Sequence, residues 1–157
     1  MPHDFPGHDD CQPWRPMNKK DLESAYRATD YRIFGPRGPF VISIGENSPE
    51  FSDILNLPDG SCWAVITASN PRSEPWTDAE NDERLQDLEV NVAAQGYRFL
   101  KGEGVSRHGN WPPEKSLLIL GIDEDSSMEL AIRYGQNAFV HGRIGEETRL
   151  VWTTVSQ

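Results

Sequence analysis

An apolar strand that runs through a polar loop into a capped helix is the feature that most constrains the fold. Residues 62–67 are short, apolar and partly β-branched, which is typical of a buried strand. Thr77 followed by Glu80 is the signature of a capping box, so a helix is predicted to begin after Thr77 and to end near Gly96. Regular structure therefore holds the loop 68–76 at both ends, and Glu80 is interpreted as structural.

The elements after residue 62 are predicted to form a common α+β arrangement. Besides the helix after Thr77, we expect strands at residues 62–67, 97–100, 115–122, 138–141 and 149–153, and a helix that a Ser126–Glu129 capping box opens. The first six elements follow the order β-α-β-β-α-β of a ferredoxin-like split βαβ core, so the last is an extra C-terminal strand. The first and third strands are then central, and the second, which contains Arg98 and Lys101, is predicted at an edge.

The N-terminal part is predicted to add a helix-hairpin-helix extension to this core. Asn18 is predicted to be the N-cap of a short helix. Strands at 31–34 and 40–44 flank a turn that contains Gly and Pro, which is typical of a hairpin. Ser48 followed by Pro49 predicts the start of a second helix.

The length of the chain favours one folded domain. A chain of 157 residues buries about two thirds of the surface that its unfolded form exposes, so one core is sufficient. Residues 1–16 are rich in Pro, His and Asp and lack periodicity. We therefore expect a mobile tail at 1–16 and a single α+β domain at 17–157. The His and Asp side chains of the tail lack a structure that would fix their geometry, so no metal site is predicted.

Charge and apolar patterning argue against two classes of partner. The chain has 25 acidic and 15 basic residues, a net charge of −10, which disfavours non-specific binding to nucleic acid. No apolar run approaches the length of a membrane span, and the N-terminus lacks an export signal, so no membrane partner is expected. Cys11 and Cys62 lack metal-site spacing and are interpreted as reduced thiols, which predicts a cytoplasmic protein.

The predicted topology brings separate polar segments to one end of the sheet. The loop after the first strand, the loop before the third strand and the start of the fourth strand should all lie there. We expect a binding site at this end. Its candidate ligand-binding residues are Thr67, Asn70, Arg72, Ser73, Asn81, Arg84, Trp111, Ser116, Gln136 and Asn137, and its candidate catalytic residue is Glu114.

The residue types at this end favour binding over proton transfer. Arg72, Arg84 and the start of the long helix suit an anionic group, and the amide side chains suit a base or a sugar edge. Glu114 is the main candidate for a general acid or base, with His108 as a possible helper. Two alternatives stay open: Glu114 forms a salt bridge with Lys115 or an arginine, and the amides join loops through hydrogen bonds to the backbone.

Four segments resemble a known family. Residues 66–71, 78–81, 111–117 and 134–138 are together similar to the bacterial family called domain of unknown function 3293, DUF3293. The resemblance covers roughly residues 25–152 and excludes the tail. It implies no particular activity, but it implies that the four segments belong together.

Three functional hypotheses follow from these patterns. The first is a domain that binds a small polar anion, nucleotide-like or sugar-phosphate-like, at this end of the sheet. The second is a small enzyme that uses Glu114 at the same site, and the third is an acidic module that binds a protein partner through a sheet edge or the hairpin. No P-loop, GxSxG, HExxH or CxxC motif occurs, and Gly102 and Gly104 are interpreted as residues of a tight loop, so no cofactor is predicted.

Overall fold

The computed structural model describes residues 18–47, 55–109 and 112–153. Its helices are α1 (Lys19–Arg27), the short 3-10 helix η1 (Pro71–Ser73), α3 (Asp78–Ala94) and α4 (Glu124–Arg133). Its strands are β1 (Thr29–Gly35), β2 (Gly38–Ser43), β3 (Cys62–Ile66), β4 (Arg98–Ser106), β5 (Glu114–Leu120), β6 (Ala138–Arg143) and β7 (Arg149–Trp152). The tail 1–16 and the start of the helix predicted at Ser48 lie outside the described residues.

The seven strands form one antiparallel sheet in the order β2-β1-β4-β5-β3-β6-β7. The central position predicted for the first and third strands of the core, β3 and β5, is confirmed. The edge position predicted for β4 is wrong, because the hairpin β1–β2 adds to the sheet and pairs with β4. The chain is thus an α+β protein in which the hairpin is part of the sheet.

Two glycines explain why β4 is longer than predicted. The sequence indicates a loop from residue 101, whereas β4 continues to Ser106. A Cβ on Gly102 would lie 2.7 Å from the carbonyl oxygen of Arg32, and one on Gly104 would lie 3.2 Å from Cγ2 of Thr29. These glycines therefore permit close approach of β1 to β4, a role in strand pairing that replaces the predicted tight loop.

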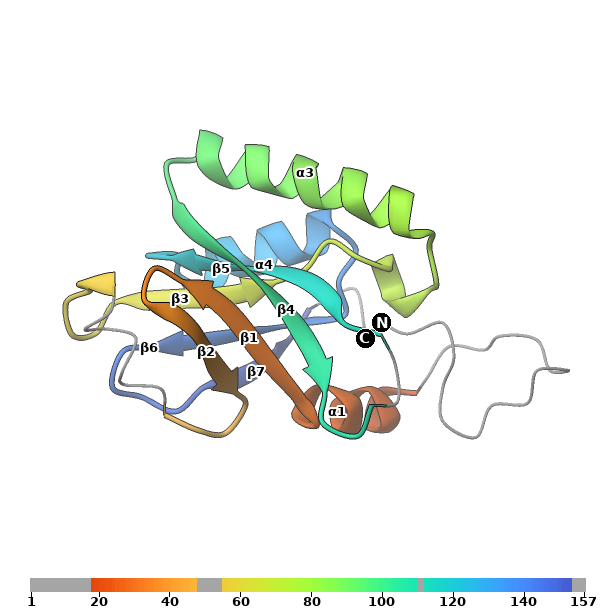
Figure 1. Cartoon of the computed structure of the whole chain (residues 1–157), viewed down its shortest axis with the longest axis horizontal. Coiled ribbons are helices and arrows are strands. Elements are labelled where there is room, and N and C mark those ends of the chain that lie inside the picture. The colour runs from red at the N-terminus through yellow and green to blue at the C-terminus, as the bar shows by residue number, and fades with distance from the viewer. Residues whose placement is uncertain (1–17, 48–54, 110–111, 154–157) are drawn as a thin grey trace, which may run out of the picture.

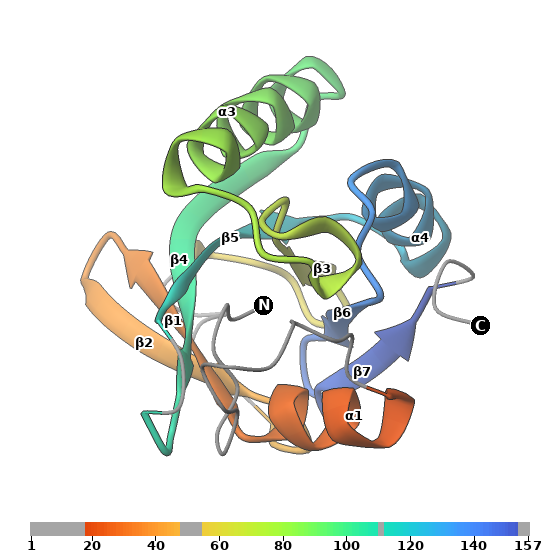
Figure 2. The same ribbon diagram turned by 90° about the vertical axis from the view of Figure 1, so that its right-hand side faces the viewer.

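Hydrogen bonds join the two ends of the curled sheet. The Gly45 N–H donates to the Thr148 carbonyl at 2.9 Å, and the Thr148 N–H donates to the Glu46 carbonyl at 3.0 Å. In Figure 2, α1 lies across the opening between the β1–β2 hairpin and β7, and Figure 1 shows α3 on the opposite side of the sheet. The sheet is therefore curled around an inner apolar cluster and covered on its outer face by α3 and α4.

Both faces of the central strands are buried in separate apolar clusters. On β3, Trp63 and Val65 point to the inner cluster with α1, while Ala64 and Ile66 belong to the outer cluster beneath α3 and α4. Each of these four side chains is at most 3% exposed. Successive side chains of a strand point to opposite faces of the sheet. Because both faces of β3 are covered, every residue of the strand is apolar rather than every second one.

Side-chain caps fix the starts of the helices. The predicted capping box is confirmed, since the Glu80 N–H donates to Thr77 Oγ1 and the Thr77 N–H donates to Glu80 Oε1. The predicted N-cap of α1 is also confirmed, because Asn18 Oδ1 accepts from the Asp21 N–H. The Ser126 capping box is wrong: α4 begins earlier, with Asp123 as the N-cap that accepts from the Ser126 N–H.

We predict that Gly142→Ala destabilises the protein through a clash with Trp63. A Cβ at Gly142 would lie 2.3 Å from Trp63 Cζ2, and Trp63 is only 1% exposed, so the ring has no space to move. Overpacking of this kind costs about 1–3 kcal/mol of unfolding free energy, measurable by urea denaturation. The same substitution in a Trp63→Leu background should cost much less, and an equal cost in both backgrounds would refute the clash.

Candidate functional site

Reciprocal hydrogen bonds between two asparagines hold the loop after β3 against the start of α3. The Asn70 N–H donates to Asn81 Oδ1, and Asn81 Nδ2 donates to Asn70 Oδ1, both at 2.9 Å. Asn70 Oδ1 also accepts from the Trp76 N–H, and Asn70 Nδ2 donates to Glu114 Oε2 at 3.1 Å. One buried amide thus connects the loop, α3 and the start of β5.

The same loop contains backbone in the left-handed region. Asn70, Arg72 and Ser73 have φ of 46°, 57° and 60°, a conformation that non-glycine residues rarely adopt. It is supported by the Arg72 N–H, which donates to the Gly135 carbonyl, and by Asn137 Nδ2, which donates to Ser73 Oγ. The segment before β6 therefore fixes the shape of the loop after β3.

Arg84 is anchored to the backbone of two segments. Its Nε donates to the Ala68 carbonyl at 2.6 Å and its Nη2 donates to the Tyr134 carbonyl. The guanidinium carbon lies 5.1 Å from the ring centre of Trp76 and 5.7 Å from that of Tyr134. The Nε and Nη2 groups of Arg84, which were assigned to a ligand, therefore bond to the protein itself.

The remaining predicted residues also lie at this end of the sheet. Gln136 Nε2 donates to the Ser69 and Tyr134 carbonyls, and Thr67 Oγ1 donates to the Lys115 carbonyl at 2.6 Å. Arg72 is exposed, and Trp111 lies outside the described residues. The three polar segments thus meet at this end of the sheet. Their amide side chains form hydrogen bonds that join the loops to each other, which is the alternative that the sequence left open.

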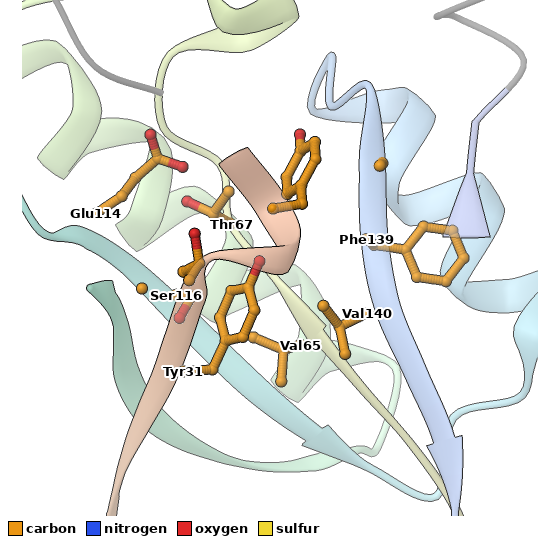
Figure 3. Close-up of a pocket in the computed structure, with 11 residues that line it drawn as sticks. Tyr31, Val65, Thr67, Glu114, Ser116, Phe139 and Val140 are labelled. Carbon is orange, nitrogen blue, oxygen red and sulfur yellow. The ribbon is translucent and has the colours of Figure 1, made fainter. Parts of the chain in front are cut away.

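A pocket opens on the inner side of the sheet, at the end where β3 stops and β5 and β6 begin. Its cavity volume is about 40 Å³. It is lined by Tyr26, Thr29, Tyr31, Val65, Thr67, Gly104, Glu114, Ser116, Ala138, Phe139 and Val140. In Figure 3 the side chains of Tyr31, Thr67, Glu114 and Ser116 lie together, whereas Phe139 points away across β6. Of the predicted site residues, Thr67, Glu114 and Ser116 line this pocket.

Sequence reasoning missed the residues that α1 and β1 contribute to the pocket. Tyr26 and Tyr31 were assigned to an extension outside the core, so nothing placed them beside Ser116. The pairing of Tyr31 with Gly104 brings β1 over the start of β5. The alternation of Tyr31 and Ile33 with polar residues indicates an inward face of β1, but only the register of β1 against β4 could have located it.

Ser116 contributes a buried hydroxyl to the pocket, without a hydrogen bond in the described part of the chain. It is 3% exposed, and its Oγ has no partner among the described residues. Burial raises the pKa of both Tyr26 and Tyr31, so their phenols stay neutral at physiological pH. Glu114 is the charged side chain among the described residues of the lining. Its neighbour Lys115 points to the opposite face of β5 and pairs with Asp82 at 3.0 Å.

His141 lies in β6, away from this pocket. It is 3% exposed, and its Nε2 lies 3.1 Å from the Ile122 carbonyl, while Nδ1 has no partner among the described residues. Burial lowers the pKa of His141, partly opposed by the hydrogen bond to Ile122. The centre of its ring lies 6.4 Å from that of Phe139, so His141 packs as a core residue.

Metal and membrane features were also sought in the described part of the chain. There, no group of three or more His, Cys, Asp or Glu side chains could hold a metal ion. None of the described helices has the length and apolar character needed to span a bilayer.

The chain is an α+β protein whose candidate site lies at one end of a curled antiparallel sheet. Residues 66–139 match the model of a family described as Protein of unknown function (DUF3293), which confirms the resemblance over this segment. The matched segment contains every predicted site residue but not Tyr26 or Tyr31. No curated protein and no solved structure matches the chain.

We predict that Arg84→Ala destabilises the protein. The substitution leaves the carbonyls of Ala68 and Tyr134 without their charged donor, and hydrogen bonds to charged groups contribute about 1.5–3 kcal/mol each. Because Arg84 is half-buried and water replaces part of the lost bonding, we expect a total loss of about 1.5–3 kcal/mol in the free energy of unfolding, measured by urea denaturation. The exposed Arg133 of α4 is the matched control, and Arg133→Ala should cost less than about 1 kcal/mol. Equal effects of the two substitutions would contradict the anchoring role.

We predict that His141 makes the protein less stable in mild acid. Because the pKa of His141 is lowered by folding, the unfolded chain binds more protons below about pH 6.5, and stability decreases as the pH falls through this range. One such proton accounts for at most about 1.4 kcal/mol per pH unit. Urea denaturation at about pH 7.5 and about pH 5.5, one unit on either side of the ordinary histidine pKa of about 6.5, should show a larger decrease in the free energy of unfolding for wild type than for His141→Gln. The same decrease in both proteins would refute the prediction.

Proposed function

We propose that the protein binds a small molecule in the pocket between α1 and the start of β5. The observation that carries this proposal is Ser116, a hydroxyl that is 3% exposed, lacks a partner among the described residues and lines a cavity. A buried polar group without a hydrogen-bond partner lowers the stability of the folded protein. A ligand that bonds to this group removes the cost, so the hydroxyl suits a ligand contact better than a core position. An apolar pocket with a few convergent polar groups is the usual form of a small-molecule site.

The size and lining of the pocket restrict the ligand. A cavity of about 40 Å³ accommodates a few heavy atoms, so it suits a short ligand or one end of a longer one. Val65, Ala138 and Val140 supply apolar contact, and Glu114 and Ser116 supply polar contact. A ligand with a short apolar part and a polar end satisfies both.

The geometry supports this pocket better than an anion site at the start of α3. The first turn of α3 is already capped by Thr77 and Glu80, and Arg84 donates to two carbonyls of the protein. Among the residues that the structure describes, the side chains that line the pocket include a carboxylate and no Lys or Arg. An anionic ligand in this pocket would therefore lie beside the carboxylate of Glu114, without Arg84 in the lining.

A catalytic role for Glu114 is the second candidate function. Glu114 lines the pocket, and Asn70 Nδ2 donates to its Oε2, so its carboxylate is held where a general acid or base could meet a bound ligand. This role requires that Glu114→Gln keeps ligand affinity and loses turnover.

We also propose a ferredoxin-like arrangement for the elements from β3 to β6, in a cytoplasmic protein. The support for the fold is the strand order β4-β5-β3-β6 together with the connections α3 and α4, which is the arrangement of a split βαβ unit. The hairpin β1–β2 and β7 then extend this unit on both sides.

We predict that Ser116→Ala weakens ligand binding without loss of stability. A thermal-shift screen of amines, alcohols, amides and short carboxylates on wild type should give ligands that, at about a hundred times their dissociation constant, add about 2.7 kcal/mol. That corresponds to roughly 5–10 °C for a domain of this size. Ser116→Ala should show a smaller shift with the same ligands, and its melting temperature without ligand should be equal or higher, because the unpaired hydroxyl is removed.

Ser127→Ala is the matched control for Ser116→Ala. Ser127 is fully buried and its Oγ donates to the Asp123 carbonyl at 2.7 Å, so its loss should cost about 0.5–1.5 kcal/mol and leave ligand shifts unchanged. Absence of any ligand from the screen, or equal shifts in wild type and Ser116→Ala, would contradict a site at Ser116.

A further inference from the structure

We infer that the polar end of the ligand is an uncharged carbonyl group, as in a ketone or a substituted amide, whose oxygen accepts hydrogen bonds from the Tyr31 phenol and the Ser116 hydroxyl. This inference rests on the proposed function and specifies the class of ligand for the same pocket. It follows from buried hydroxyl groups without partners, from the strand register that brings two of them together, and from the cost of burying a charge beside them.

Three hydroxyl groups of the pocket have no partner among the described residues. The side chains of Tyr26, Tyr31 and Ser116 are at most 8% exposed. Ser116 Oγ lacks a hydrogen bond, and no hydrogen bond joins either phenol to the described part of the chain. By contrast, the phenol of Tyr134 at the end of α4 donates to Asp87 Oδ2 at 2.6 Å. Buried hydroxyls usually have a partner, so three without one in a single pocket indicate a ligand that supplies it.

Strand register brings the Tyr31 phenol to Ser116. Tyr31 pairs with Gly104 of β4, and Gly104 pairs with Glu114 of β5, two residues before Ser116. A Cβ on Gly104 would lie 3.4 Å from Cε1 of Tyr31, so the glycine lets the ring lie over β4 toward β5. Figure 3 shows the side chains of Tyr31 and Ser116 next to each other in the pocket. One ligand group can therefore contact both hydroxyls.

A carbonyl oxygen matches this pair of donors. Each hydroxyl has one hydrogen to donate, and a carbonyl oxygen has two lone pairs, so it can accept from Tyr31 and Ser116 together. An alcohol in the same place adds a hydrogen of its own, for which the site has to supply another acceptor. The carboxylate of Glu114 already accepts from Asn70 Nδ2 and has a further interaction within the protein. A polar end without a donor hydrogen therefore suits the lining better.

The surroundings of the two hydroxyls favour an uncharged ligand. Burial raises the pKa of Tyr26 and Tyr31, which means that their environment disfavours a negative charge. No Lys or Arg is among the described residues that line the pocket, so a bound carboxylate would lack a partner of opposite charge. A bound ammonium would need a carboxylate, and Glu114 already has partners in the protein. Taking an ion out of water without such a partner costs more than taking out a carbonyl group.

Four probes of similar shape separate the carbonyl group from other polar ends. Acetone, 2-propanol, acetate and isopropylammonium have the same number of heavy atoms around a central carbon and differ in charge and in donor hydrogens. Each can be titrated into the full chain at neutral pH and constant ionic strength, with affinities from changes in amide NMR signals. We expect acetone to bind about fivefold more tightly than 2-propanol, the effect of about one hydrogen bond, and both ions to bind most weakly. The signals that change should include those of residues 31, 65–67 and 114–116.

The role of the Tyr31 hydroxyl is tested with a matched pair of variants. Tyr31→Phe keeps the ring and should lower acetone affinity about fivefold, while the melting temperature stays equal or rises because the hydroxyl has no partner in the described part of the chain. Tyr134→Phe is the control: it should leave acetone affinity unchanged and lower the melting temperature, because the bond to Asp87 is lost. Full acetone affinity in Tyr31→Phe would overturn the inference.

The wild-type titration tests the inference even if a variant fails to fold. Equal or tighter binding of 2-propanol or of either ion would overturn the carbonyl assignment and leave the pocket as a small-molecule site. Failure of all four probes in a protein for which the ligand screen does find binders would also overturn it, without affecting the proposed function. Failure of the probes and of the whole screen would refute both.

Discussion

Burial of both faces of β3 and β5 is the constraint on which the rest of the structure depends. Every side chain from Trp63 to Ile66 and from Leu117 to Ile119 is at most 3% exposed, so none of these positions can hold a polar group without a partner. Polar side chains are therefore placed at the ends of the central strands. That placement explains why Thr67, Ser116 and Asn137 meet at one end of the sheet.

At that end, most of the polar groups serve the protein itself. Asn70, Asn81, Arg84 and Gln136 join the loop after β3, the start of α3 and the segment before β6. Their hydrogen bonds support left-handed backbone that would otherwise be unfavourable. Asn70 also contacts Glu114, so this network fixes the position of a carboxylate at the edge of the pocket. Residues that hold the loops thereby prepare the site without having to touch a ligand.

The sequence predicted the local elements well and the long-range pairing less well. The apolar run of β3, the capping box at Thr77 and the apolar run of β5 are local patterns, and each was assigned correctly. The extent of β4 was missed, because Gly102 and Gly104 are unfavourable in an isolated strand and are acceptable only beside β1. The same missing contact hid the pocket, since Tyr31 reaches Ser116 only when β1 joins the sheet. Residues that lie far apart in sequence and meet through strand register carry no local signal.

Strand register also determines which side chains of β5 lie beside the pocket. Glu114 and Ser116 face the inner side of the sheet, while Lys115 between them faces outward and pairs with Asp82 of α3. A shift of β5 by one residue would exchange these faces, placing the ammonium of Lys115 in the pocket and the carboxylate of Glu114 beneath an acidic helix. The bond from Thr67 Oγ1 to the Lys115 carbonyl and the pairing of Ile66 with Leu117 oppose this shift. The contacts that stabilise the centre of the sheet therefore also keep the carboxylate of Glu114, and not the ammonium of Lys115, beside the pocket.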